Sequence, residues 1–271
     1  MPFFSMRAQP VALSVALLVL AGCSHPSADP STFGVSAATT DAGKGAGFAW
    51  SISYPALLPQ WQVLDHAIHD FAAAQKKQFL QASTAQDRVK GADYSLDLTF
   101  VVARHTADFV SVLGSGDEFT GGAHGMPLTA SFNLDLSANK LVVLGDLFAD
   151  PGAALKAISD ECRRQLEGRN EAKMRDDGRT ITDEDDKSMR TWVEKGTTPT
   201  PANFGVFLVD GLDAKAIGLA ILFPPYQVGP YSDGPQQVEV PAKVFYDQLK
   251  PEYKDAFAID TEAAKLAPGV R

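Results

Sequence analysis

Short runs in which large apolar residues alternate with polar ones constrain the fold of this chain more than any other feature. The alternation is clearest over residues 48–54, 94–103 and 132–136, and it is typical of half-buried β-strands. A turn-forming segment at residues 137–140 joins the last of these runs to a further apolar run at residues 141–144. Because hairpin turns of this kind outnumber long helical crossovers, we expect a mainly antiparallel α+β fold rather than a doubly wound parallel sheet.

Apolar residues at helical spacing predict three or four helices packed against these strands. Residues 60–81 carry a stripe of large apolar side chains, and Asp150 is a good N-cap for a helix over residues 151–168. A shorter helix is expected around Trp192, and a final one at about residues 242–249. Since each helix should cover one face of a sheet, we expect two intimately associated lobes.

The N-terminal segment has the order of a bacterial export signal. Arg7 precedes an apolar run at residues 11–20, which is shorter than the roughly 20 residues that a membrane-spanning helix needs. The Leu-Ala-Gly-Cys sequence at residues 20–23 has the form of the bacterial lipobox, in which the cysteine sulfur is acylated before cleavage ahead of it. We therefore expect residues 1–22 to be a lipoprotein signal peptide and Cys23 to be lipidated.

Lipidation of Cys23 predicts where the protein resides. More than one acyl chain holds a protein firmly to a bilayer, because each buried methylene contributes about 0.8 kcal/mol. Ser24, in place of an aspartate, resembles the residue that follows the cysteine in lipoproteins of the Gram-negative outer membrane. The sequence thus predicts a protein anchored in the outer membrane that faces the periplasm. A plain signal peptide cut near Ala21 is the alternative.

The rest of the chain divides by composition. Residues 23–47 hold few large side chains, so they are expected to form a flexible tether. An N-terminal α+β lobe is expected over residues 48–115 and a C-terminal α+β domain over residues 116–250. Residues 251–271 are expected to form a C-terminal tail.

The net charge argues against a nucleic-acid-binding protein, and the cysteine content argues against a disulfide-stabilised one. Removal of residues 1–22 leaves 23 basic and 33 acidic residues, a net charge of −10, which argues against nucleic acid as a partner. Once Cys23 is lipidated, Cys162 has no partner for an intramolecular disulfide. Cys162 shares a helical face with Leu155 and Ile158, so we expect a buried core residue rather than a nucleophile.

A glycine-rich motif at residues 120–125, Thr-Gly-Gly-Ala-His-Gly, contains the sharpest candidate for a functional histidine. Gly121 and Gly122 permit positive φ angles, so the motif predicts a tight connection between strands. His124 could serve as a base, a ligand or a binding residue. The structural alternative, in which its ring bonds a backbone carbonyl and fixes the turn, is favoured because no acid or second ligand stands at a fixed spacing from it.

Tyr226 and Tyr231 are candidates for a recognition surface. They lie in a stretch rich in proline and glycine, residues 223–234, which predicts a rigid loop. Tyrosine is favoured at recognition surfaces because it offers a large area with few rotatable bonds. The equally supported alternative is a loop that covers the end of the sheet, with the tyrosine hydroxyls bonded to backbone.

Other patterns predict neither a metal nor a cofactor nor a catalytic residue. His66, His69 and Asp70 have the helical offsets of a two-histidine metal site, but a solvated helix face is the simpler interpretation. The acidic segments at residues 176–178 and 183–186 do not fit the EF-hand register, because a lysine would occupy its first ligand position. The chain also lacks the usual zinc-protease, phosphate-loop and nucleophile-elbow motifs.

Three segments together resemble a family of extracytoplasmic domains. They are Gly-Gly-Ala-His-Gly at residues 121–125, Asp-Leu-Phe at 146–148, and the stretch from Phe-Pro-Pro-Tyr at 223–226 to Val-Glu-Val-Pro at 238–241. The combination is similar to the uncharacterised C-terminal region of lysozyme-sensing anti-sigma factors. The same domain stands beside the catalytic domain of peptidoglycan deacetylases and in many Gram-negative lipoproteins.

This resemblance implies an α+β fold and a binding role without accepted catalytic residues. In the anti-sigma factors the domain binds lysozyme, which exposes a segment near the membrane to proteolysis. The present sequence shows neither a sigma-binding region nor a deacetylase domain. We therefore expect binding of a lysozyme-like wall hydrolase or of peptidoglycan, without signalling across a membrane.

The sequence as a whole predicts a membrane-anchored, non-enzymatic binding module of the cell envelope. The predicted partners are the membrane, through the lipid on Cys23, and a wall hydrolase or peptidoglycan. The alternative is a peptidoglycan hydrolase or deacetylase that uses His124 beside a carboxylate. The candidate binding residues are Gly121, Gly122, His124, Tyr226 and Tyr231.

Overall fold

The computed structural model describes the chain from residue 38 to residue 259, apart from a few internal positions, 87, 90, 177–181 and 213. The predicted signal peptide, the predicted lipidation site at Cys23 and most of the predicted tether lie outside the described residues. Within the described part of the chain, no helix combines the length and hydropathy that a membrane span requires.

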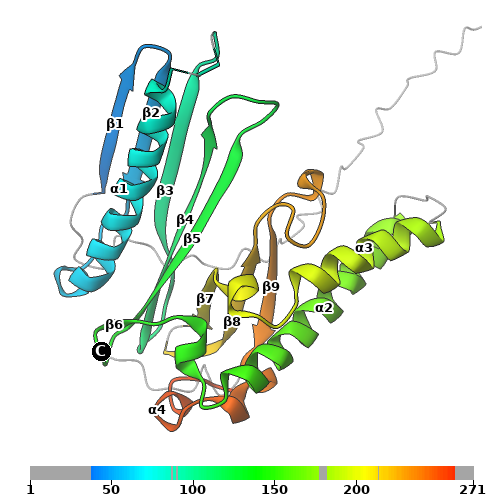
Figure 1. The fold of residues 1–271 in the computed structure, drawn as a ribbon. Coiled ribbons are helices and arrows are strands. Elements are labelled where there is room, and N and C mark those ends of the chain that lie inside the picture. Colours follow the sequence, from blue (N-terminus) through cyan, green and yellow to red (C-terminus); the bar gives the residue numbers. More distant parts are fainter. Residues whose placement is uncertain (1–37, 87, 90, 177–181, 213, 260–271) are drawn as a thin grey trace, which may run out of the picture.

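Six strands form the larger sheet, and their order across the sheet is their order along the chain. Every neighbouring pair is antiparallel except β2 and β3, which are parallel and are connected through helix α1 (Gln62–Thr84). This arrangement, blue to green in Figure 1, confirms the mainly antiparallel α+β prediction. The strands are β1 (Thr39–Gly45), β2 (Phe48–Tyr54), β3 (Tyr94–His105), β4 (Phe109–Phe119), β5 (Met126–Asp135) and β6 (Lys140–Leu141).

Helix α1 covers one face of the larger sheet (Figure 1). The stripe expected from its sequence buries Leu64, Ile68 and Phe79 in one core cluster with Leu98 and Phe100 of β3. Successive side chains of a strand point to opposite faces of a sheet. The residues that alternate with these buried positions therefore lie on the face opposite α1.

Three antiparallel strands form the smaller sheet, in the order β7 (Phe207–Leu212), β8 (Lys215–Phe223) and β9 (Gln236–Pro241). Helix α2 (Pro151–Asp176) contributes Leu155, Ile158 and Cys162 to the same buried cluster as this sheet. Asp150 caps α2 as predicted, because its Oδ1 accepts a hydrogen bond from the N–H of Ala153 at 3.0 Å.

Helix α2 continues past Gly168, where the sequence predicted its end. Arg190 of helix α3 (Asp183–Gly196) lies along this extension, 3.8 Å from Glu167 and 3.3 Å from Glu171. Packing between the two helices stabilises the last helical turns of α2, which are polar and have little apolar surface of their own. As a result α2 and α3 form a long pair that extends away from the smaller sheet (Figure 1).

The predicted flexible tether is wrong for its last part, because Thr39–Gly45 form strand β1 at the edge of the larger sheet. Asp41 anchors this strand to its neighbours. Its carboxylate accepts a hydrogen bond from Nε1 of Trp50 at 3.1 Å and one from Nζ of Lys76 at 2.8 Å. Small polar residues thus form a strand here because backbone pairing with β2 and one carboxylate supply the contacts.

The predicted C-terminal boundaries also need correction. The helix expected at residues 242–249 is a pair of short 3-10 turns, and helix α4 (Pro251–Lys254) follows it. Phe257 of the predicted tail is only 2% exposed and packs in the core of the smaller lobe. The predicted lobe boundary between residues 115 and 116 falls inside β4.

A polar seam joins the two sheets. β7 is the outermost strand of the smaller sheet, and its backbone is bonded by Ser111, Ser131 and Asn133 on the face of the larger sheet opposite α1. Asn133 Nδ2 donates to the carbonyl of Phe207 at 2.9 Å, and the Val209 N–H donates to Ser111 Oγ at 3.0 Å. We call Ser111, Ser131 and Asn133 the seam residues.

Candidate functional site

The connection between β4 and β5 has the tight geometry that its sequence predicts. Gly121 and Gly122 adopt φ angles of 96° and 108°, which side chains other than hydrogen rarely tolerate. These two glycines turn the chain so that His124 projects from the tip of the hairpin with an exposed ring. The role of the glycines is therefore to shape the loop that carries His124.

The structure brings the two predicted candidate loops together. The His124 ring is stacked on Tyr231 with the ring centroids 4.3 Å apart, and its Nε2 lies 3.3 Å from the hydroxyl of Tyr226. The rings of Tyr226 and Tyr231 are 5.4 Å apart. We call His124, Tyr226 and Tyr231 the aromatic cluster. It is contributed by the larger lobe through the β4–β5 hairpin and by the smaller lobe through the loop between β8 and β9.

Tyr226 is held in an unusual conformation at this cluster. Its φ angle is 71°, a left-handed value that is costly for a bulky residue, and the residue is 47% exposed. The following residue, Gln227, fixes the loop, since its Nε2 donates to the carbonyls of Gly196 and Asn203, both at 2.9 Å. A strained and exposed ring on a fixed loop is a common feature of binding sites.

The second half of the same loop is fixed to α2. Lys173 Nζ lies 2.7 Å from the Oδ1 of Asp233, two residues after Tyr231. The loop is thus bonded at Gln227 and at Asp233, and these contacts restrict the positions of the two tyrosines.

His124 has the partner that the structural alternative predicted. Its Nδ1 lies 2.8 Å from the carbonyl oxygen of Gly125. Among the described residues, no hydrogen bond or ion pair joins its ring to a carboxylate; its other contacts are the two tyrosines. This environment suits a residue that packs and donates hydrogen bonds at a recognition surface.

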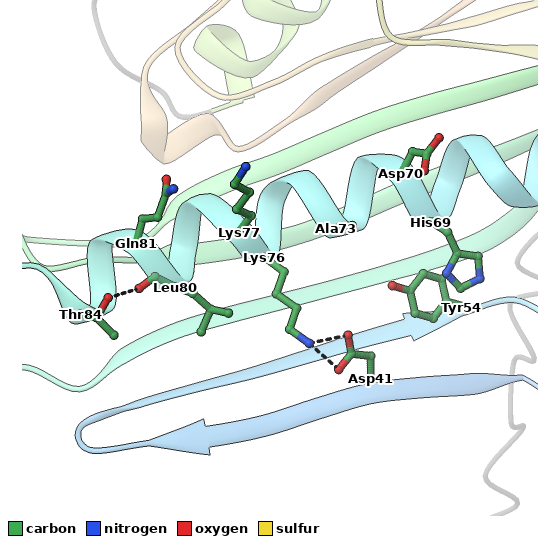
Figure 2. A pocket seen from close by; sticks show the side chains of 10 residues that line it. All are labelled: Asp41, Tyr54, His69, Asp70, Ala73, Lys76, Lys77, Leu80, Gln81 and Thr84. Carbon is green, nitrogen blue, oxygen red and sulfur yellow. Dashed lines mark hydrogen bonds and ion pairs between the residues drawn. The ribbon is translucent and has the colours of Figure 1, made fainter.

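A groove of about 800 Å³ lies between α1 and the edge of the larger sheet (Figure 2). The Lys76 ammonium crosses it to Asp41 at 2.8 and 2.9 Å, and it also lies 4.5 Å from the ring centroid of Trp50. These hydrogen bonds, with that from Trp50, hold the pKa of Asp41 below its usual value. The lining residues are Asp41, Tyr54, His69, Asp70, Ala73, Lys76, Lys77, Leu80, Gln81 and Thr84.

His69, one of the two histidines considered for a metal site, lines this groove. His69 is stacked on Tyr54 with the centroids 4.0 Å apart, and its Nε2 is 3.6 Å from Asp65. The described residues contain no group of three or more histidine, cysteine or acidic side chains that could hold a metal ion. The groove could not be predicted from the sequence, because one of its walls is β1, whose small and polar residues predict a flexible tether.

Cys162 is buried, as predicted, and is completely inaccessible to solvent. Burial, with Glu161 nearby, raises the pKa of its thiol to about 12. Because the thiolate is the reactive form, Cys162 should not react with a thiol reagent at neutral pH until the protein unfolds.

This prediction can be measured with the Cys23→Ala protein, in which Cys162 is the single thiol. An aromatic disulfide reagent should release no chromophore from the native protein, and should release one equivalent after denaturant is added. Rapid labelling of the native protein would show that the site opens locally.

A family model matches part of the chain, and a curated relative matches most of it. Residues 145–243 match the family described as "Protein of unknown function (DUF3298)". The peptidoglycan-N-acetylmuramic acid deacetylase PdaC of Bacillus subtilis (strain 168) is 23% identical over 212 residues. The match covers 78% of this chain but 41% of that protein, so the chain spans less than half of the relative's length.

Two crystal structures share the fold. A DUF3298 family protein from Pseudomonas aeruginosa PAO1 aligns with a TM-score of 0.50 at 17% identity, over 79% of this chain and 93% of its own. A DUF3298 family member from Bacteroides fragilis NCTC 9343 aligns with a TM-score of 0.51 at 17% identity, over 82% and 96%. The resemblance to a domain found in peptidoglycan deacetylases thus has support, and the resemblance to anti-sigma factors stays a prediction.

Proposed function

We propose that this protein is a lipid-anchored module of the cell envelope that binds a wall partner through the aromatic cluster and has no catalysis of its own. The lipid on Cys23 would hold it to the outer membrane, facing the periplasm. The observation that carries the proposal is the aromatic cluster itself, in which two loops from different lobes present His124, Tyr226 and Tyr231 side by side.

The composition of the cluster supports binding rather than catalysis. Tyrosine rings offer large, stiff contact surfaces with a polar end, and they are frequent at binding hot spots. A catalytic histidine is commonly oriented and charged by a carboxylate, whereas the partners of His124 among the described residues are two phenol rings and a backbone carbonyl. The likeness to a protein named for its action on peptidoglycan supports a partner in the cell wall.

The proposal predicts that removal of the two tyrosine rings abolishes most of the binding. In the Tyr226→Ala/Tyr231→Ala protein, co-sedimentation with purified peptidoglycan sacculi, or binding to immobilised lysozyme, should weaken at least tenfold. Truncation of a hot-spot residue costs about 2 kcal/mol of binding free energy or more. Alanine keeps a β-carbon at residue 226, so the strain of its backbone is retained and the ring alone is removed.

Two controls make the result specific. Tyr226→Phe keeps the ring and should retain binding close to that of the unaltered protein. Val143→Ala changes a side chain that is 68% exposed elsewhere on the larger lobe, and it should have no effect. If the double variant remains folded and binds both probes as the unaltered protein does, the proposal is wrong.

A further inference from the structure

An unbroken row of hydroxyl side chains crosses the larger sheet on the face opposite α1. The strand registers place Thr40 opposite Ser53, Ser53 opposite Thr99, Thr99 opposite Ser115, and Ser115 opposite Thr129. These five residues, which we call the hydroxyl row, come from five neighbouring strands. With strands about 4.8 Å apart, the row is about 19 Å long.

The hydroxyl row is open to solvent and its hydroxyls are unused. Thr40, Thr99 and Ser115 are exposed, and Val101, two residues further along β3 on the same face, is 45% exposed. Within the part of the chain that the structure describes, none of the five hydroxyls makes a hydrogen bond. Each therefore has a donor and acceptor capacity that only water or a ligand can satisfy.

The same face shows what such side chains do when they are covered. Ser111 of β4 and Ser131 of β5 lie on this face, and their hydroxyls accept hydrogen bonds from the backbone N–H groups of Val209 and Phe207 at the edge of β7. Ser115 and Thr129 continue these two lines of residues toward the hairpin that carries His124. The hydroxyl row thus lies between the polar seam and the aromatic cluster, on the face against which the smaller lobe stands.

The charges beside the row define the chemistry of a ligand. The next row toward the hairpin contains Asp97 opposite Asp117, and neither carboxylate has a cationic partner among the described residues. The other residues of this second row are Ala42, Ser51 and Pro127. Neither this row nor the hydroxyl row contains a lysine, an arginine or a large apolar side chain. Carboxylates and hydroxyls bind a neutral ligand rich in hydroxyl groups, and they offer no site for an anion or for an apolar anchor.

From this arrangement we propose that the wall partner is a glycan strand, which stacks a sugar ring on Tyr226 and Tyr231 and lies across the hydroxyl row. The proposal rests on the proposed function of the aromatic cluster and names its ligand class. The C–H face of a pyranose ring complements the negative face of an aromatic ring. Its hydroxyl and acetamido groups donate to and accept from the hydroxyl row and Asp117.

The test uses a defined sugar and the full-length protein in detergent. The probe is the β-1,4-linked hexamer of N-acetylglucosamine, and its binding is measured by calorimetry at low and high salt. Because the ligand is neutral, its affinity should change less than twofold between the two salt concentrations, whereas binding of a basic protein would weaken strongly.

The variant that tests the row is Thr99→Val/Ser115→Ala/Thr129→Val. It removes three hydroxyls and keeps strand-forming shapes, and it should bind the hexamer about tenfold more weakly or worse. The matched control is Thr84→Val/Ser188→Ala/Thr191→Val, which removes three hydroxyls from α1 and α3 and should bind as the unaltered protein does. Equal melting temperatures establish that both variants remain folded.

The outcomes separate this inference from the proposed function. If the hexamer binds the row variant and the unaltered protein equally, the row is not part of the site and the inference is overturned. A second outcome is that the unaltered protein does not bind the hexamer, while the Tyr226→Ala/Tyr231→Ala protein, the tyrosine variant, still loses its binding to lysozyme. The partner is then a protein, so the inference fails and the proposed function stands. If the tyrosine variant loses no binding to any probe, both are wrong.

Discussion

Replacement of Asn133 by alanine should lower the free energy of unfolding by about 2–3 kcal/mol. Asn133 is 2% exposed, its Nδ2 donates to the Phe207 carbonyl, and its Oδ1 accepts from Ser111 Oγ at 2.6 Å. The substitution leaves that carbonyl and that hydroxyl buried without these partners. Since removal of one partner of a buried hydrogen bond costs the desolvation of the group left behind, the loss exceeds that of a surface bond.

Chemical denaturation with urea measures this loss. Asn203→Ala is a suitable control, because the Asn203 side chain also donates to two carbonyls, those of Lys195 and Thr198, but in an exposed setting. It should cost less than about 1 kcal/mol. Ser111→Ala combined with Asn133→Ala should cost less than the sum of the single changes, because the two side chains belong to one network. Additive effects would argue against a coupled seam.

Replacement of Phe257 by alanine should lower the free energy of unfolding by about 3–5 kcal/mol, the range for large aromatic residues in a core. Phe257 is 2% exposed, and the centroid of its ring lies 5.6 Å from that of Phe245 and 5.9 Å from that of Phe109. Phe109 belongs to β4 of the larger sheet, so Phe257 packs where the two lobes meet. The cavity left by the ring would therefore weaken both lobes.

Ile259→Ala is the matched control for Phe257, two residues away in the same segment. Ile259 is 52% exposed, so its truncation should change stability by less than about 0.5 kcal/mol. Both variants can be compared in one series of thermal and urea melts. A small loss for Phe257→Ala would mean that the segment after α4 is only loosely attached.

The larger sheet was predictable because its signals are local. Alternation in residues 94–103 and the apolar stripe of α1 each follow from their own sequence, and each strand pairs with a strand that is adjacent along the chain. β1 gave no such signal, since its residues are small and polar, and its place depends on pairing with β2 and on Asp41. Phe257 gave none either, because a single aromatic residue in a short polar segment has no period.

The candidate site was predictable in its parts but not as a whole. The glycines around His124 and the prolines around Tyr226 mark two separate loops, each with a structural and a functional interpretation. That the loops meet follows only from the packing of the two lobes, which the seam residues fix. From the sequence alone, these polar residues would be expected to face solvent. A sequence does not show which polar side chains a strand distant along the chain will cover.

The order of the strands in the larger sheet also sets the order in which the molecule can fold. Its antiparallel pairs join through short connections, and β2 reaches β3 through α1, so the whole sheet is built from residues 39–141 and can form before the smaller sheet is synthesised. Ser111, Ser131 and Asn133 are then in place before Phe207 and Val209 emerge. The larger lobe can thus act as a template for the smaller one, and the aromatic cluster, which needs both lobes, can form only after both are in place.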